Sequence, residues 1–282
     1  MPSFDTPQPI SVIAHVDAGS IQFVAGDRAD TTVDVQPRDP KKDRDVKTAQ
    51  QTEVALTHGT LHIRTPKATL FGMGRTGVVD VTVELPADSQ LEVTGAWTQV
   101  RGTGPLGEVR AKTSSGDVRF DETGPLHLTA SHGSISVDRI QGAAEITTSS
   151  GSLRVGTIEG TAVLKNSHGS TTVGDITGDL RVSGANGDIT VERAEGSVAA
   201  TTAHGTLRVF EVARGVAQLE TSYGAIEVGI REGTAAWLDV TSGSGQVINS
   251  LTASENPAKT EDTIEVRART KFGNIEVRRA RP

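Results

Sequence analysis

The sequence predicts an all-β protein built as a parallel β-helix, or β-solenoid, of about 18 residues per coil. A short sequence motif recurs at a fixed period. Apolar and polar residues alternate within the motif, and a glycine occupies the same position in each copy. The steps between successive glycines are 17, 18, 18, 18, 18 and 19 residues. These glycines are Gly116, Gly133, Gly151, Gly169, Gly187, Gly205 and Gly224. A constant period indicates repeated units that stack on one another.

Each repeat is expected to hold two strands and a corner, because aliphatic residues recur in five columns. Two columns precede the glycine: Leu126, Ala144, Ala162, Leu180, Val198, Ala217; and Leu128, Ile146, Leu164, Val182, Ala200, Leu219. Two follow it: Ile135, Leu153, Ile189, Leu207, Ile226; and Val137, Val155, Val173, Val191, Val209, Val228. The fifth is Ile140, Ile158, Ile176, Ala194 and Val212. Spacing of two within a strand places these residues in the core, and the final step of three marks a bend.

The whole chain, residues 1–282, is expected to form a single β-solenoid domain. Residues 1–106 are predicted to form irregular N-terminal coils with loops, 107–247 the regular array, and 248–282 the terminal coil. Three segments interrupt the period: 37–52, 65–77 and 249–263. The first is charged and could hold a short helix from Asp43 to Gln51. The second is expected to fold back over the open end of the solenoid, since unpaired strand edges invite aggregation.

Composition excludes several classes of site and partner. There is no cysteine, which excludes disulfides and thiolate chemistry. The net charge of −7 argues against a nucleic-acid partner, although the stretch from Arg267 to Pro282 contains six basic residues and one acidic residue. We interpret that basic stretch as a solvated last strand, with docking on an anionic surface as the alternative. No signal peptide, anchor or transmembrane segment is visible, so a cytoplasmic location is expected and a surface location stays open.

Recurrent histidines do not predict a metal site. His132, His168 and His204 fall on every second coil. Equivalent atoms two coils apart are separated by about 9.6 Å, whereas zinc holds each nitrogen at about 2.0–2.1 Å. A calcium roll is also disfavoured, because only Asp117 and Asp188 follow a turn glycine in the regular array. These positions are best interpreted as polar corners.

The sequence predicts no catalytic, cofactor-binding or metal-binding residues, and hence no cofactor and no enzyme. The stretch Gly102–Gly107 matches a nucleotide loop by letter only, because a strand follows it and no helix. Outward acids are interspersed with arginines, as on a solvated face. If a site exists, it is expected where the period breaks, at 37–52, 65–77, 249–263 or the basic C-terminus.

The repeats resemble a known bacterial family. The run Val79–Val93, followed by tandem units such as Thr147–Val155, is similar to the β-strand-repeat proteins called putative adhesins, a domain of unknown function. The resemblance covers about Ile10 to Val277. It implies a right-handed β-helix, and it brings no catalytic residues with it.

The leading hypothesis is a non-enzymatic, adhesin-like binding or scaffolding protein with an unidentified protein or polymer partner. A broad flat solenoid face suits an extended partner. The alternatives are a self-assembling filament or oligomer, built by stacking at the coil ends, and a carbohydrate-active β-helix enzyme.

Overall fold

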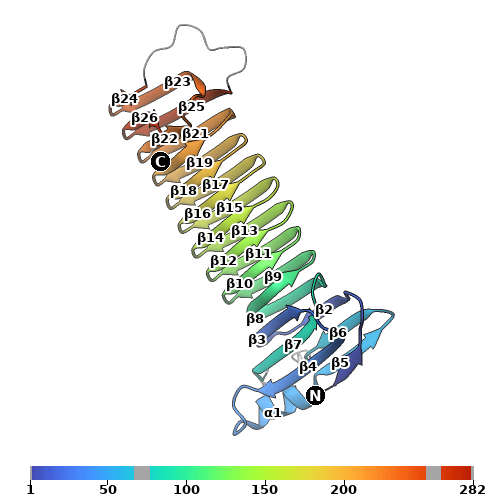
Figure 1. Ribbon diagram of the computed structural model, residues 1–282. Helices are drawn as coiled ribbons and strands as arrows, with labels where there is room; N and C mark the ends of the chain where they lie inside the picture. Colours follow the sequence, from blue (N-terminus) through green and yellow to red (C-terminus); the bar gives the residue numbers. More distant parts are fainter. Residues whose placement is uncertain (1, 67–76, 252–261, 281–282) are drawn as a thin grey trace. The chain divides into compact units, whose positions relative to one another are not determined.

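A computed structural model describes residues 2–66, 77–251 and 262–280 (Figure 1). The chain divides into two compact units, Met1–Gln141 and Gly142–Pro282, which we describe in turn. Both units are almost entirely β-structure, so the predicted all-β solenoid class is confirmed. The single domain and the right-handed winding remain predictions.

Unit 2 is a stack of two-stranded coils in which every described strand pairing is parallel. One face holds β13 (Ala144–Ser150), β15 (Ala162–His168), β17 (Leu180–Asn186), β19 (Val198–His204), β21 (Gly215–Tyr223), β23 (Ala235–Ser244) and β25 (Thr263–Phe272). The other holds β14 (Leu153–Ile158), β16 (Thr171–Ile176), β18 (Ile189–Ala194), β20 (Leu207–Val212), β22 (Ile226–Ile230), β24 (Val247–Asn249) and β26 (Ile275–Arg279). Each coil contributes one strand to each face.

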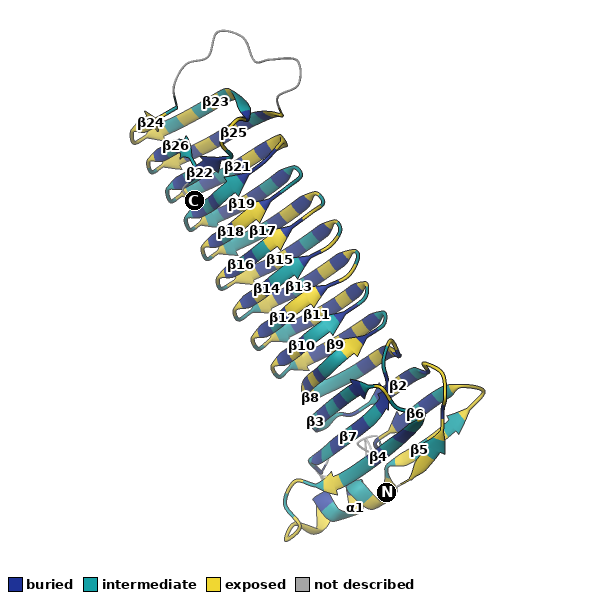
Figure 2. Cartoon of the chain, viewed as in Figure 1, coloured by how far each residue is buried: buried dark blue, intermediate teal, exposed yellow. Residues whose placement is uncertain are grey.

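The predicted core columns of unit 2 are confirmed residue by residue. Ala162 pairs with Leu180, Leu180 with Val198, and Val198 with Ala217. All of these side chains are buried, and the polar residues between them point outward (Figure 2). The alternation therefore sets the register of every coil in this unit, because a slip by one residue would turn the apolar columns toward water.

A threonine ladder inside the corner is a feature that the aliphatic columns did not predict. Thr221 Oγ1 donates to the Gly205 carbonyl at 3.2 Å, and Thr270 Oγ1 donates to the Gly224 carbonyl at 3.1 Å. Asn166 holds the same place and donates to the Gly151 carbonyl at 3.0 Å. These buried side chains donate hydrogen bonds to backbone carbonyls at the glycine corner that do not take part in the pairing between strands.

The last coils of unit 2 do not stack in sequence order. Strand β25 lies between β21 and β23, and β26 lies between β22 and β24 (Figure 1). The glycine corners show the same order: a Cβ on Gly273 would lie 2.0 Å from the Gly224 carbonyl oxygen, and one on Gly245 would lie 2.0 Å from that of Gly273. The predicted terminal coil, 248–282, is thus corrected: its strands β25 and β26 are penultimate, and the outermost coil is β23–β24.

Core chemistry explains this order. Val247 and Asn249 of β24 are the Cα partners of Ile275 and Val277 of β26. Ile275 and Val277 are fully buried, while Val247 and Asn249 are exposed. An asparagine in the column would bury an amide without a partner, which costs about 1–3 kcal/mol. The strand with an apolar residue at both core positions, β26, therefore takes the inner place.

Unit 1 contains the remaining strands and the helix of the described residues. They are β1 (Ser3–Asp5), β2 (Ser11–His15), β3 (Ala18–Gly26), β4 (Asp30–Pro37), α1 (Asp43–Gln51), β5 (Glu53–Thr57), β6 (Thr60–Arg64), β7 (Val79–Pro86), β8 (Gln90–Leu106), β9 (Val109–Ser115), β10 (Val118–Thr123), β11 (Leu126–His132) and β12 (Ile135–Ile140). The long strand β8 pairs in parallel with β2 and β9 through its first half, and with β3 and β10 through its second.

The first coils are irregular, as the sequence predicts, and the irregularity is antiparallel pairing. Strand β4 pairs antiparallel with β1 and β7, and β5 pairs antiparallel with β6. The helix α1 lies at the predicted residues. Its buried Asp45 accepts a hydrogen bond at 3.0 Å from the N–H of Val78, the residue directly before β7. The predicted capping loop at 65–77 and the loop at 249–263 lie largely outside the described residues.

Candidate functional site

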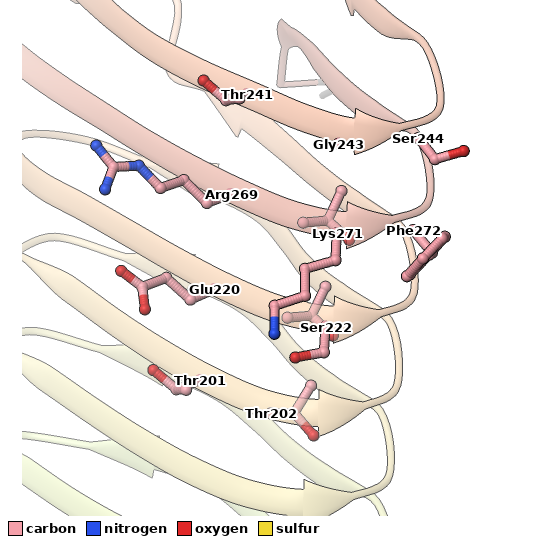
Figure 3. Close-up of a pocket in the computed structure, with 12 residues that line it drawn as sticks. Thr201, Thr202, Glu220, Ser222, Thr241, Gly243, Ser244, Arg269, Lys271 and Phe272 are labelled. Atoms are coloured by element: carbon pink, nitrogen blue, oxygen red, sulfur yellow. The ribbon is translucent and has the colours of Figure 1, made fainter.

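An open groove lies on the outer face of β19, β21, β25 and β23 (Figure 3). Its volume is about 850 Å³, within the range of about 300–1,000 Å³ typical of ligand sites. Polar side chains line it, and Phe272 closes one end. The polar lining includes Thr201, Glu220, Ser222, Thr241, Arg269 and Lys271.

The strand order of unit 2 assembles this groove. Glu220, Arg269 and Thr241 are successive Cα partners on β21, β25 and β23. Each side chain points outward because its neighbours along the strand fill the core. If the coils stacked in sequence order, Thr241 would lie beside Glu220, and Arg269 would lie at the end. The inserted strand β25 therefore brings its two cationic residues in the groove, Arg269 and Lys271, to the centre of the face.

Three aromatic rings stack along the corner beside the groove. The ring centroids of His204 and Tyr223 are 5.0 Å apart with an interplanar angle of 2°, and those of Tyr223 and Phe272 are 4.9 Å apart at 7°. These distances match the spacing of about 4.8 Å between neighbouring strands. Tyr223 and Phe272 are each about half exposed, at 50% and 51%. The stack therefore presents an apolar surface to solvent at the rim of a polar groove.

The charges around the groove are mostly paired. Arg269 forms an ion pair with Asp239 at 3.1 Å, and Arg267 forms one with Glu265 at 2.8 Å. Glu220 accepts a hydrogen bond from the Gln218 amide at 3.1 Å. Among the described residues, the Lys271 ammonium has no ion-pair partner. The groove thus holds hydroxyls, one carboxylate, one paired cation and one unpaired cation.

Each unit also contains an arginine that forms ion pairs with two carboxylates, and these ion pairs are accompanied by pKa shifts. In unit 2, Arg231 donates to Glu195 at 2.8 Å and to Glu211 at 2.8 Å. The hydrogen bonds from Arg231 lower the pKa of Glu195, and those to Glu195 and Glu211 raise the pKa of Arg231.

In unit 1, Arg28 pairs with Asp30 at 2.9 Å and with Glu84 at 2.5 Å. The hydrogen bonds from Arg28 lower the pKa of both carboxyls. Beside them, burial acts to raise the pKa of Asp80, but hydrogen bonds from Arg38 and Ser20 outweigh it and lower that pKa. These ion pairs and hydrogen bonds connect neighbouring segments of the chain, and we interpret them as structural.

The structure does not gather the histidines singled out in the sequence. His132 lies in unit 1, whereas His168 and His204 lie on β15 and β19 of unit 2, with β17 between them. No group of three or more potential metal ligands occurs among the residues that the structure describes. Of the segments where a site was expected, 37–52 packs as α1, 67–76 and 252–261 lie outside the described residues, and the basic C-terminus supplies Arg269 and Lys271 to the groove.

Sequence reasoning missed Phe272 and its stack on Tyr223. Both residues stand directly before a turn glycine, Gly224 or Gly273, as His204 stands before Gly205. That shared position is a signal for one column. The column does not by itself predict the stack, because β23 separates β21 from β25 in the sequence. Sequence order would place Ser244 beside Tyr223, and Phe272 takes that place only because β25 is inserted.

Comparison with known proteins identifies a family. A search of curated proteins finds no similar sequence. Among solved structures, a putative adhesin from Bacteroides fragilis is 13% identical, with 98% of this chain and 95% of that chain covered at a TM-score of 0.40. A putative adhesin from Parabacteroides merdae is 11% identical, with 98% and 94% covered at a TM-score of 0.41.

A putative lipid binding protein from Parabacteroides distasonis is 10% identical, with 99% of this chain and 96% of that chain covered at a TM-score of 0.28. No helix in the described part of the chain is long and apolar enough to cross a membrane. The model of the family described as Toastrack DUF4097 matches residues 12–279. The protein therefore belongs to the Toastrack DUF4097 family.

Proposed function

We propose that the protein is a non-enzymatic, adhesin-like binding module that holds an extended partner, a protein or a polymer, on the outer face of its coils. The observation that carries this proposal is the groove over β19, β21, β25 and β23, an open surface lined by hydrogen-bonding side chains beside exposed aromatic rings. Rigid strands fix these groups in place, which favours binding because little conformational freedom is lost.

The groove is better equipped to bind than to react. It is lined by one carboxylate, Glu220, whereas glycoside hydrolysis uses a pair of carboxylates about 5–9.5 Å apart. No histidine lines it. Its cations and hydroxyls can hold a ligand through hydrogen bonds and charge.

The proposal is tested by blocking the groove. Ser222→Trp would fill the centre of the face, and Lys112→Trp, on the exposed side of β9 in unit 1, is the matched control. Immobilised protein is screened against peptides and polysaccharides, and the release of reducing ends and of peptide fragments is followed in parallel. We expect binding that Ser222→Trp abolishes and Lys112→Trp leaves intact, with no cleavage. Cleavage of a bound polymer, or binding that Ser222→Trp leaves unchanged, would overturn it.

Self-association is the second candidate function, and the uncovered edge of unit 2 favours it. Within the described residues, β23 pairs only with β25 and β24 only with β26. No described strand pairs with the other edge of β23 or β24, and Val247 and Ile248 beside it are exposed, so this edge could template pairing with another chain. Sedimentation velocity at rising concentration tests this. We expect association that Ile248→Lys weakens, and a strict monomer at every concentration would refute it.

A further inference from the structure

We propose that the groove of unit 2 binds an acidic oligosaccharide, with one pyranose ring stacked on Phe272 and one carboxylate held by Lys271. This inference rests on the proposed binding function and assigns it a ligand class. It is carried by three features of the described residues: an aromatic stack that ends abruptly, a polar groove at that end, and an unpaired cation between them.

The aromatic stack ends with one ring face uncovered. His204, Tyr223 and Phe272 come from three neighbouring strands and lie nearly parallel. The next strand, β23, places Ser244 opposite Phe272. A serine has no ring, so no ring of the described residues covers the face of Phe272 that points away from Tyr223. A flat ligand ring could continue the stack there at the same spacing of about 4.8 Å.

The groove begins at that face. Ser244, Gly243, Lys271 and Phe272 all line it, and Figure 3 shows the Lys271 side chain extending across the face toward Ser222 and Glu220. Ser222 and Gly243, on the strands that flank Lys271, are small, and this leaves the groove open beside the stack. A ligand on Phe272 therefore also reaches the polar groups on β21 and β25.

Lys271 favours a ligand with negative charge. The neighbouring cations Arg267 and Arg269 have carboxylate partners, at 2.8 Å and 3.1 Å, but the Lys271 ammonium has none among the described residues. A carboxylate of the ligand would give it a charge-assisted hydrogen bond.

The mixed polarity of the groove favours a sugar over other anions. Glu220 lies in the same groove as Lys271, so a phosphate group, with a charge of about −1.5 to −2, would meet more repulsion there than a singly charged carboxylate. A sugar hydroxyl would donate to Glu220 and accept from Arg269 or Thr241. The C–H face of a pyranose can pack on an aromatic ring, whereas a wholly apolar ligand would leave these polar groups without partners.

The length of the groove favours an oligosaccharide over a single sugar. It crosses β19, β21, β25 and β23, three strand spacings that together span about 14 Å. Its volume of about 850 Å³ exceeds what one ring fills. The site would therefore take a short stretch of an acidic polysaccharide.

Calorimetric titration of the full chain with tetragalacturonate tests the proposal, and its fully methyl-esterified form is the uncharged control ligand. We expect the charged ligand to bind, and the ester to bind at least about tenfold more weakly. Phe272→Ala and Lys271→Gln should each weaken binding of the charged ligand by about tenfold. Phe272→Trp, which keeps an aromatic face, should retain it.

Trp97→Ala and Lys112→Gln are the matched controls, because both replace exposed side chains of the same kinds in unit 1. Neither should change the affinity by more than about twofold. Circular dichroism of each variant shows whether the fold is retained. Equal binding of the charged ligand and the ester, no binding of either, unchanged affinity in Phe272→Ala, or tighter binding of adenosine monophosphate would each overturn the proposal.

The outcomes separate this inference from the proposed function. If the Ser222→Trp block abolishes binding of a different polymer while tetragalacturonate fails to bind, the binding function stands and the acidic-sugar assignment is wrong. If tetragalacturonate binds through Phe272 and Lys271 and is then cleaved, the ligand assignment stands and the non-enzymatic function is wrong.

Discussion

Strands β2 and β3 of unit 1 and the last two strands of unit 2 occupy the same kind of place in their sheets. In unit 1, β2 and β3 precede β6, β7 and β8 in the chain, but β2 lies between β6 and β8, and β3 lies between β7 and β8. In unit 2, β25 and β26 come last but lie between the earlier coils. In both units these strands are enclosed by strands that are not their neighbours in the sequence.

The two units differ in what covers the outermost coil. In unit 1, the antiparallel strands β4, β1 and β5 add to the ladders beyond β7 and β6, and α1 is hydrogen-bonded to Val78, directly before β7. In unit 2, the described residues place no strand beyond β23 and β24. Antiparallel strands therefore extend the sheet beyond β6 and β7 in unit 1, whereas no described strand extends it beyond β23 and β24 in unit 2. The groove and the exposed aromatic rings lie on the last coils of unit 2, up to β23.

The largest expected effect comes from charging the interior of a regular coil. Leu164 is fully buried, so Leu164→Asp should reduce the free energy of unfolding by about 4 kcal/mol or more, since it buries a charge without a partner. Lys165→Asp, on the exposed side of the same strand, should change it by less than about 0.5 kcal/mol. Urea denaturation measures both, and equal effects would show that the assignment of faces is wrong.

The next effect distinguishes the inserted coil from the outermost one. Ile275→Asp, in β26, should cost at least about 3 kcal/mol because its side chain is fully buried. Val247→Asp, at the partner position in β24, should cost about 1 kcal/mol or less because that side chain is 47% exposed. The same denaturation experiment compares them. A larger loss for Val247→Asp would mean that β24 is the interior strand.

A smaller effect is expected from the corner threonines. Thr270→Val removes the hydrogen bond to the Gly224 carbonyl and should cost about 1–2 kcal/mol. Thr148 provides the contrast, because its buried hydroxyl has no hydrogen-bond partner among the described residues. Thr148→Val should therefore be neutral or stabilising. Thermal unfolding monitored by circular dichroism would show the ranking, and a costlier Thr148→Val would refute this role for the ladder.

The smallest effect is a pH dependence of the free energy of unfolding that comes from the ion pair between Arg231 and Glu195. The pKa of Glu195 is lowered in the folded protein, so its contribution is present above the unfolded pKa of about 4.3 and is lost as the pH falls through the lower folded value. Arg231→Gln should remove that part of the acid sensitivity and cost under about 1 kcal/mol at neutral pH, since the pair is partly exposed. Unfolding measured from pH 7 to pH 3 checks this, and an unchanged pH profile would contradict it.

Most of the fold of the regular coils could be predicted from the sequence, because one simple constraint determines it. A period near 18 and an alternation of two leave a single register in which residues such as Leu164 and Val182 share a core column. The short helix at Asp43–Gln51 was also predictable, since charge and local pattern mark it.

The order of the last coils could not be predicted from the period alone. Whether β24 or β26 lies inside depends on comparing Asn249 with Val277 at equivalent core positions, and this comparison needs the three-dimensional register. The candidate site was hidden for the same reason. Phe272 and Tyr223 become neighbours only because β25 is inserted.

The insertion of β25 is the central claim, because the groove and the aromatic stack depend on it. The chain has no cysteine, so an engineered pair can report neighbours directly. Gln218 and Arg267 are Cα partners if β25 lies next to β21, whereas Asp239 then lies one strand further away. Neighbouring strands at about 4.8 Å suit a disulfide, and strands about 9.6 Å apart do not.

We therefore compare the double variants Gln218→Cys/Arg267→Cys and Gln218→Cys/Asp239→Cys under mild oxidation. Peptide mass spectrometry identifies the intramolecular disulfide in each. The structure predicts ready formation in the first pair and little in the second. A disulfide that forms only between positions 218 and 239 would show that the coils stack in sequence order, and it would contradict both the groove and the ligand assigned to it.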